Sequence, residues 1–205
     1  MTVSVIVPTL DPDSQMARQC VDHIGDADIH LVHDTDRDGF VATCHRGAAD
    51  ATGDVLVFLN DDTVPQPGWL AAITAAVTDD RIVGGLMAYP DGTVQHSGVF
   101  FRRRSGVLEA FNRHTVAPTG EVPAVTGACL AITRNRWDEL EGFDDGYVNG
   151  YEDVDLALRH REAGGHVWFA SECVVVHFES QSPGRFIHAQ QNVARLQDRW
   201  GHLPI

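Results

Sequence analysis

The sequence contains no lysine: all 15 basic residues are arginine, against 29 acidic residues, and the formal net charge is −14. An acidic surface of this kind works against binding to a polyanion, because phosphate backbones are held by basic side chains. The one dense basic run is Arg102-Arg103-Arg104. The sequence leaves this run open as a solvated turn or as a contact for an anionic partner.

Membrane-length apolar runs and closely spaced cysteine pairs are also missing. No stretch approaches the roughly 18–20 consecutive apolar residues of a membrane-spanning helix. The N-terminus lacks the basic start and the small-residue cleavage site of a signal peptide, so we expect a cytoplasmic protein. The cysteines lie far apart and form no CxxC pair, so we expect reduced core residues at Cys20, Cys44, Cys129 and Cys173.

Short apolar, β-branched runs alternate with helix-like segments in the first half of the chain. This repetition predicts an α/β fold with a mainly parallel central sheet flanked by helices, in a single domain over residues 1–205. The strand C-termini, and any ligand site, then lie along one edge of the sheet. Strands are expected at residues 3–7, 29–32, 55–59 and 82–83, with helices around Cys20 and at residues 39–51 and 69–77.

The second half of the chain is less regular. The turn signal Pro90-Asp91-Gly92-Thr93 predicts a hairpin between residues 86–89 and 94–101. Further strands are expected at residues 122–125, 128–133, 167–169 and 173–177. Helices are expected at residues 151–163 and from about residue 186 to residue 200.

Two adjacent carboxylates follow the strand expected at residues 55–59. Asp61 and Asp62 come after Asn60 at the C-terminal end of this strand. Mg²⁺ and Mn²⁺ sites commonly combine one or two carboxylates with substrate phosphates. An isolated Asn-Asp-Asp sequence is more often a polar turn that caps a helix. Its place at the ligand edge of the sheet nevertheless favours a metal site.

A second pair of carboxylates, Glu152 and Asp153, falls at the start of the helix expected at residues 151–163. Acidic side chains are common there because the helix dipole stabilises negative charge, so a structural pair is an equally good interpretation. A carboxylate that removes the proton from an attacking hydroxyl is worth about 10²–10⁴-fold in rate. Asp153 is the candidate base, whereas Asp155 points to another face of the helix and is expected to serve the structure.

His177 ends the apolar run at residues 173–176 and precedes a Ser/Pro/Gly-rich stretch that leads to Arg185. A single histidine at a strand end is usually a hydrogen-bonded structural residue. Loops of this composition can, however, fold over a ligand. His177 would then offer a neutral imidazole to a metal ion, with Arg185 near a diphosphate.

Taken together, these segments resemble the family 2 inverting glycosyltransferases of the GT-A fold, a Rossmann-like architecture, and in particular their rhamnosyltransferase-like subgroup. The resemblance covers the chain from Val3 to about Arg185, and it rests on the order and spacing of motifs that are weak one by one. The motifs are VIVPT (5–9), GFVATCHRG (39–47), FLNDDT (58–63), DGTVQHSG (91–98), TGAC (126–129), GFD (142–144), YEDVDL (151–156) and the His177 segment.

The resemblance implies roles for the matching positions. Asn60-Asp61-Asp62 matches the family's variant of the DxD motif, in which Asp61 contacts the ribose or the metal. Trp137 and Phe143 match either sugar contacts or core packing. The implied nucleotide-sugar-binding residues are Pro8, Thr9, Asp34, Arg46, Asn60, Asp61, Gly127 and Arg185, the catalytic residues are Asp153 and Glu152, and the metal ligands are Asp62 and His177.

The same resemblance implies an enzyme that uses Mn²⁺ or Mg²⁺ and inverts the anomeric centre in a single displacement. The expected donor is a nucleotide sugar, with a UDP- or dTDP-sugar as the leading choice. The acceptor would be a glycan, a lipid-linked saccharide or a small molecule. A nucleic-acid acceptor is disfavoured by the acidic surface, and the sequence leaves open whether the protein forms a homo-oligomer.

Two features depart from the family pattern. Only residues 34–38 separate the second strand from Gly39, where relatives have a longer acidic loop and a helix, so the nucleotide pocket is trimmed at Asp34. The sequence ends soon after Trp200, where many relatives carry a C-terminal extension. We therefore expect a soluble, minimal catalytic domain.

Two other functions compete with this interpretation. A nucleotidyltransferase also combines a parallel sheet with a metal-binding acid pair, but it would typically show a glycine-rich, basic phosphate loop near the first strand. The segment from Pro8 to Pro12 is not such a loop. The second alternative is a non-catalytic module that binds a sugar or a nucleotide on the same fold, because a fold does not determine a function.

Overall fold

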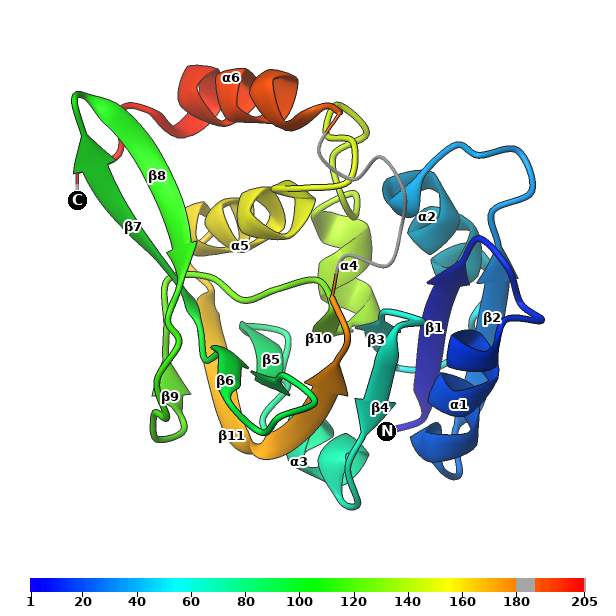
Figure 1. Cartoon of the computed structure of the whole chain (residues 1–205). Coiled ribbons are helices and arrows are strands. Elements are labelled where there is room, and N and C mark those ends of the chain that lie inside the picture. The colour runs from blue at the N-terminus through cyan, green and yellow to red at the C-terminus, as the bar shows by residue number, and fades with distance from the viewer. Residues whose placement is uncertain (180–186, 205) are drawn as a thin grey trace.

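Within residues 1–179 and 187–204, which the computed structural model describes, nine strands form one sheet (Figure 1). The strand order is β2-β1-β3-β10-β5-β11-β4, with β6 paired to β5 and β9 paired to β11. These strands are β1 (Val3–Thr9), β2 (Asp28–His33), β3 (Val55–Leu59), β4 (Thr63–Pro65), β5 (Arg81–Ala88), β6 (Val94–His96), β9 (Gly120–Glu121), β10 (Cys129–Thr133) and β11 (His166–His177). The two remaining strands, β7 (Val99–Arg104) and β8 (Val107–Asn112), form a separate hairpin.

Most of the strands on the main path run in one direction. β1 is parallel to both β2 and β3, and β5 is parallel to β11. β10 lies between these two groups and is antiparallel to β3 and to β5. The two groups therefore point the same way, and the predicted α/β fold with a mostly parallel central sheet is confirmed.

Helices cover both faces of the sheet. Figure 1 shows α5 and α6 above the sheet and α3 below it. Alternate residues of a strand point to opposite faces, so Val57 shares a core with α1 and α3, and Phe58 shares a core with α2 and α5. The helices are α1 (Gln15–Ile24), α2 (Phe40–Asp50), α3 (Trp69–Thr74), α4 (Arg134–Glu139), α5 (Glu152–Glu162) and α6 (Ala189–Trp200).

Some elements differ from those expected from the sequence. Residues 122–125 form no strand: Ala124 makes only an isolated bridge to Val99. The two strands expected at residues 167–169 and 173–177 are one strand, β11, whose register shifts between Ala170 and Val174. The run Arg102-Arg103-Arg104 ends β7, where Arg102 lies 2.7 Å from Glu109 and Arg103 donates to the carbonyl of Gly201 at 2.6 Å.

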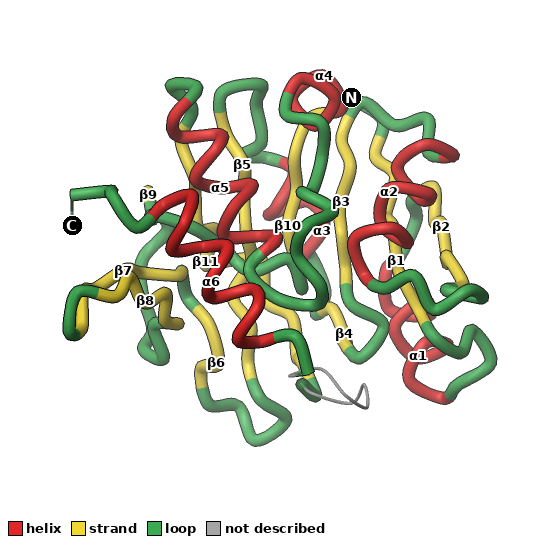
Figure 2. Tube along the Cα trace, turned by 90° about the horizontal axis from the view of Figure 1, so that it is seen from above, coloured by secondary structure: helices red, strands yellow, loops and turns green. Residues whose placement is uncertain are grey.

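The last helix, α6, lies on the near side of the molecule in Figure 2, over α5. Asp155 of α5 holds it there, because its carboxylate accepts a hydrogen bond from Trp200 at 2.8 Å and lies 3.3 Å from the guanidinium of Arg199. The side chain of Asp155 is fully buried, as a structural residue should be. On its other side α6 binds the hairpin, since the side chain of Gln197 makes two hydrogen bonds to the backbone of Leu108.

All four cysteines are free and buried, as expected for reduced core residues. The Sγ atoms of Cys129 and Cys173 lie 3.9 Å apart. Across the described part of the chain, each helix is too short or too polar to span a membrane.

Candidate active site

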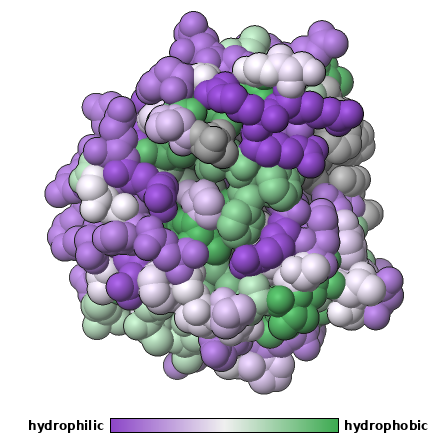
Figure 3. Space-filling model, turned by 90° about the vertical axis from the view of Figure 1, so that its left-hand side faces the viewer, coloured by the Kyte–Doolittle hydropathy of each residue, from purple (hydrophilic) through white to green (hydrophobic). Residues whose placement is uncertain are grey.

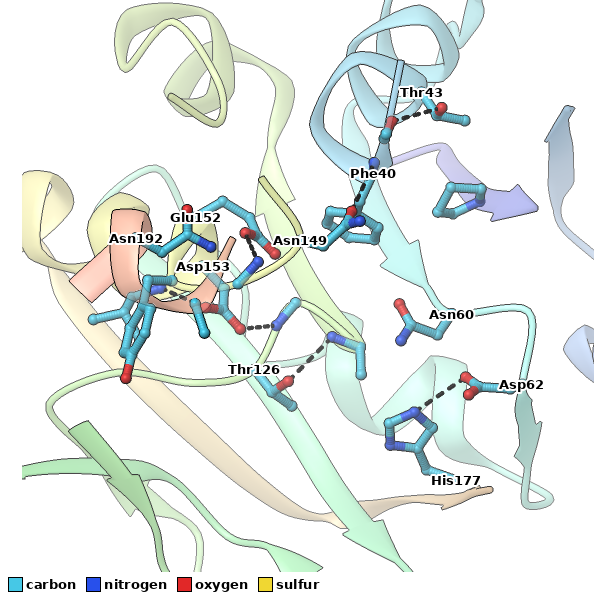
Figure 4. Close-up of a pocket in the computed structure, with 18 of the residues that line it drawn as sticks. Phe40, Thr43, Asn60, Asp62, Thr126, Asn149, Glu152, Asp153, His177 and Asn192 are labelled. Carbon is cyan, nitrogen blue, oxygen red and sulfur yellow. Dashed lines mark hydrogen bonds and ion pairs between the residues drawn. The ribbon is translucent and has the colours of Figure 1, made fainter. Parts of the chain in front are cut away.

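Several strand ends meet at one edge of the sheet and open a cavity of about 610 Å³. β1, β3 and β11 end there because they run in one direction, and β10 starts there because it runs in the opposite direction. The cavity is therefore lined by Thr9 at the end of β1, by Asn60 after β3, by Gly127 before β10 and by His177 at the end of β11. Figure 4 shows Asn60 and His177 among the lining residues. This is the edge at which the sequence placed the ligand site.

Asp61 and Asp62 lie in the turn between β3 and β4. The hydroxyl of Thr9 donates a hydrogen bond to Asp61 at 2.5 Å and so joins the ends of β1 and β3. Burial raises the pKa of Asp61 above its ordinary value, although the hydrogen bond from Thr9 opposes this shift. The charged form of Asp61 is therefore less stable in the cavity than in water, and a bound cation would stabilise it.

His177 lies beside Asp62 because β4 pairs antiparallel with the end of β11. His177 is opposite Thr63 in this pairing, and the amide of Phe178 donates to the carbonyl of Asp62 at 2.9 Å. The imidazole Nε2 is 3.1 Å from Oδ1 of Asp62, and the two side chains are 6% and 11% exposed (Figure 4). At the other side of the ring, Nδ1 is 2.6 Å from Oε1 of Gln95.

The pair Asp62–His177 fits two ligands of a divalent cation. Adjacent ligands of an octahedral ion with bonds of about 2.1 Å are about 3.0 Å apart. The observed 3.1 Å agrees with that spacing. Within the described ranges, no group of three or more His, Cys, Asp and Glu side chains is arranged to hold a metal. The other ligands would then be substrate phosphates and water, as is usual for Mg²⁺.

Asp153 lies on the opposite wall of the cavity from Asp62, at the first turn of α5 (Figure 4). Its Oδ2 accepts a hydrogen bond from the amide of Gly127 at 2.7 Å, and its Oδ1 accepts one from the amide of Val154 at 2.7 Å. The neighbouring Glu152 is buried and accepts a hydrogen bond from the amide of Gly150 at 2.5 Å. Both carboxylates line the cavity, and both are held by backbone amides.

The backbone around Asp153 is constrained on two sides. A methyl group at position 127 would be in van der Waals contact with Asp153, 3.4 Å from its Cβ, so the loop at Gly127 packs directly against this side chain. Tyr151, which precedes α5, has a φ of 71°, a left-handed conformation that is costly for a residue with a side chain. The surrounding fold therefore fixes the place of the Asp153 carboxylate.

Asp34 closes the short loop that leads into α2. Its buried carboxylate accepts hydrogen bonds from the amides of Asp38 and Gly39, each at 3.0 Å, and from Arg46 at 3.3 Å. Arg46 also donates to Asp38 at 3.2 Å and to Thr43 at 3.1 Å. Asp34 and Pro8 line the cavity, whereas Arg46 is not part of its lining. Arg46 thus supports Asp34 from behind, where the sequence had placed it in the pocket.

The second half of the chain forms the remaining wall. Ala110, Phe111 and Asn112 of β8, Tyr151 before α5 and Asn192 of α6 line it. Figure 3 shows the face of the molecule that carries the hairpin: its rim is mostly hydrophilic, and apolar side chains gather in a hollow near its centre. On the described part of this wall, the only charged side chains are the carboxylates at the start of α5.

Sequence reasoning missed this wall and the support behind His177. A usable signal for the hairpin was present, because Ser105-Gly106 is a two-residue turn with φ of 51° and 83°. Positive φ at both central residues is typical of tight hairpin turns. Gln95 gave no such signal, since its contact with His177 joins residues 82 positions apart.

The remaining predicted residues are the aromatic pair Trp137 and Phe143, and Arg185. Trp137 and Phe143 are buried with Phe58, at ring-centroid distances of 4.5 Å and 5.2 Å, and they do not line the cavity. Core packing is therefore their role. Arg185 lies outside the described residues.

The chain is similar to known proteins in sequence and in structure. The model of a family described as "Glycosyltransferase like family 2" matches residues 1–201. The O-antigen biosynthesis protein RfbC of Myxococcus xanthus is 32% identical over 149 residues, which are 66% of this chain and 12% of that protein. This chain thus spans only a small part of that relative.

Two solved structures share the fold. The crystal structure of GalNAc-T7 with UDP, GalNAc and Mn²⁺ has a TM-score of 0.67 at 16% identity, over 97% of this chain and 48% of that one. The mannosyltransferase PcManGT from Pyrobaculum calidifontis, in complex with GDP-Man and Mn²⁺, has a TM-score of 0.63 at 17% identity, over 98% and 65% of the two chains. Both likenesses place the chain in the same architecture.

Proposed function

The chain belongs to the glycosyltransferase-like family 2, and we propose that it is the metal-dependent catalytic domain of an inverting glycosyltransferase. One observation carries the proposal: a buried Asp62–His177 pair and the amide-held Asp153 lie on opposite walls of one cavity. A two-ligand cation site and a separate carboxylate are what a transfer from a sugar diphosphate to a hydroxyl needs.

In this proposal, one wall of the cavity binds the nucleoside diphosphate of the donor and the metal ion. Pro8, Thr9 and Asp34 form the side that receives the nucleoside, next to Asp61. Asp62 and His177 would hold Mn²⁺ or Mg²⁺ on this side. When bound, the ion supplies positive charge that offsets the charge developing on the leaving diphosphate.

Asp153 takes the proton from the acceptor hydroxyl while that oxygen attacks from the face opposite the leaving group. The amide of Gly127 holds Oδ2 of this carboxylate at 2.7 Å, so the base keeps its place during the transfer. A single displacement of this kind inverts the anomeric centre. Glu152 supports the turn before α5 through the amide of Gly150.

The substrates are proposed by class. We expect a UDP- or dTDP-sugar as donor and a rhamnosyltransferase-like subgroup, for which the similarity to an O-antigen biosynthesis protein is the support. The acceptor would be a glycan, a lipid-linked saccharide or a small molecule with a free hydroxyl. Tyr151 and Phe111 offer aromatic surface to an acceptor sugar on the wall that has few charges.

Thermal unfolding with UDP, dTDP, GDP and their sugars, each with and without Mn²⁺, tests the proposal. A ligand of the native state raises the unfolding temperature as its concentration exceeds Kd. We expect a Mn²⁺-dependent rise with one nucleotide class, and loss of the Mn²⁺ dependence in Asp62→Ala but not in Asp138→Ala, an exposed control. Turnover should release a nucleoside diphosphate and no pyrophosphate. No rise with any nucleotide would overturn the proposal.

A further inference from the structure

Gln95 is buried directly behind His177, on the side of the ring that faces away from Asp62. It lies in β6, which pairs with β5, and is 3% exposed. Its Oε1 is 2.6 Å from Nδ1 of His177. Its amide nitrogen is 3.4 Å from the backbone carbonyl of His177 and 3.4 Å from the carboxylate of Glu179. One side chain therefore contacts the ring of His177 and the chain that follows it.

These contacts determine which end of the Gln95 amide faces the imidazole. The carbonyl of His177 and the carboxylate of Glu179 are acceptors, so the amide NH₂ must point toward them. A flipped amide would place its oxygen against two other oxygens. Glu179 is itself held, because the hydroxyl of Tyr89 donates to the same carboxylate oxygen at 3.0 Å. The carbonyl oxygen of Gln95 therefore faces Nδ1.

The orientation of Gln95 sets the tautomer of His177. An amide oxygen only accepts, so Nδ1 of His177 carries the proton and Nε2 of the neutral ring keeps a lone pair. That lone pair lies 3.1 Å from the Oδ1 atom of Asp62, and two such acceptors attract a cation between them. With the proton on Nε2 instead, His177 would donate to Asp62, and neither atom would be available to a metal ion.

We propose that Gln95 is a positioning residue that keeps His177 in the Nδ1-protonated tautomer, so that Nε2 can bind a divalent cation together with Asp62. The inference rests on the proposed function, in which these two side chains hold the ion. Hydrogen bonds to the second nitrogen of a metal-binding histidine fix its tautomer and its ring orientation. Gln95 would supply that bond here from a different strand.

The tautomer can be measured without metal, nucleotide or turnover. In ¹⁵N-labelled, metal-free protein, long-range ¹H–¹⁵N spectra of the histidine rings distinguish a protonated Nδ1 from a protonated Nε2. The signals of His177 are identified by their loss in His177→Asn. We expect a protonated Nδ1 in the wild type and a protonated Nε2 in Gln95→Leu, which removes the acceptor beside Nδ1. A wild-type ring with the proton on Nε2 and none on Nδ1 would overturn the inference.

Binding of Mn²⁺ gives a second readout. The electron paramagnetic resonance signal of free Mn²⁺, titrated with protein in the presence of UDP, reports the affinity. We expect Gln95→Leu to weaken it by about 10–100-fold, the usual effect of removing such a partner. The control is Gln66→Leu, because the side chain of Gln66 donates to the nearby carbonyl of Val64 and is not part of the cavity lining. Thermal unfolding shows whether each variant is folded.

The outcomes separate the inference from the function on which it rests. Unchanged Mn²⁺ affinity in Gln95→Leu, beside clear binding by the wild type, would overturn the role of Gln95 and leave the metal-dependent function intact. Failure of the wild type to bind Mn²⁺ with any nucleotide would overturn the metal-dependent function. The tautomer spectra would still report whether Gln95 controls the protonation of His177.

Discussion

Asp153 and Asp155 are two positions apart on α5, yet their carboxylates lie in different surroundings. Asp153 lines the cavity and accepts the amide of Gly127, whereas Asp155 is fully buried against Trp200 and Arg159. Successive helical positions differ by about 100° around the axis, so residues two apart face away from each other. The proposed chemical role of Asp153 and the structural role of Asp155 are therefore separable by mutation.

Asp153→Asn should lower kcat by about 10²–10⁴-fold, because the amide cannot accept the proton of the acceptor hydroxyl. The single asparagine oxygen can still accept the hydrogen bond from Gly127, although the bond from Val154 is then lost. Asp62 and His177 lie on the opposite wall, so binding of the donor with Mn²⁺ should persist. Steady-state kinetics and ligand-dependent thermal unfolding check both parts, with Asp138→Asn as the control at an exposed position. Wild-type turnover in Asp153→Asn would remove this residue from the mechanism.

His96 should make the stability of the protein depend on pH. It is fully buried between Asn112 and the amide of Gly98, and burial lowers its pKa to about 4, from an ordinary value of 6.5. The unfolded chain therefore binds a proton near pH 6.5, while the folded protein does so only near pH 4. The contribution of a neutral His96 to the free energy of unfolding is therefore complete above pH 6.5, the pKa in the unfolded chain. It is lost as the pH falls toward about 4, the pKa in the folded protein.

Lowering the pH from about 7 to about 5 should cost about 2 kcal/mol through His96 alone. His96→Gln, which cannot titrate, should be less stable than the wild type at pH 7 but should lose less stability on acidification. Urea unfolding at the two pH values gives the loss of unfolding free energy for each protein. Contributions from the other histidines cancel when the two losses are subtracted. Equal losses in the two proteins would contradict the burial of a neutral His96.

The contact between α5 and α6 depends on a buried charge. Asp155 is surrounded by Arg159 at 2.7 Å and by Arg199 at 3.3 Å, and Trp200 donates to it at 2.8 Å. Asp155→Asn should destabilise the protein by about 3 kcal/mol, because removal of one partner leaves the buried Arg159 guanidinium uncompensated. Denaturant unfolding measures the loss, and Asp153→Asn on the same helix should change it by less than about 1 kcal/mol. A neutral effect at position 155 would show that α6 is held by packing alone.

Elements with a continuous apolar run could be predicted from the sequence, because burial on both faces leaves a clear pattern. β1, β3 and β10 are of this kind, and α5 was marked by the acidic residues at its start. β4 could not be predicted, since it has three residues and contains Pro65. Its existence depends on tertiary pairing with β11, and this pairing brings Asp62 to His177.

Part of the candidate site could also be predicted from the sequence, because the apolar strands fix the order of the elements. Carboxylates after β3 and at the start of α5 could be placed at the ligand edge from the order of elements alone. The partner of each side chain could not be placed, as the pairs His177–Gln95 and Asp153–Gly127 show, because they join strands and helices that are distant in the sequence. Arg46 has the expected residue type but turns toward Asp34 and Asp38.

At the scale of the whole molecule, the net charge of −14 opposes compact folding through self-repulsion. Raising NaCl from about 20 mM to about 500 mM should screen this repulsion and raise the unfolding temperature by about 2–4 °C. KCl should act equally if screening is the cause. A fall in unfolding temperature would instead indicate that ion pairs such as Asp144 with Arg195 outweigh the net repulsion.

The two walls of the cavity come from different parts of the chain, and this division bears on how such a domain could diversify. The wall with Asp62 and His177 is built on strand ends of the central sheet, while the hairpin and α6 stand outside that sheet. Gln197 and Arg103 tie the hairpin to α6 and to the chain just after it, so the two form one exchangeable unit. A chimera that inherits the hairpin of one relative and the last helix of another would break these bonds, whereas joint transfer would replace the parts of one wall that β8 and α6 form and leave Asp62 and His177 in place.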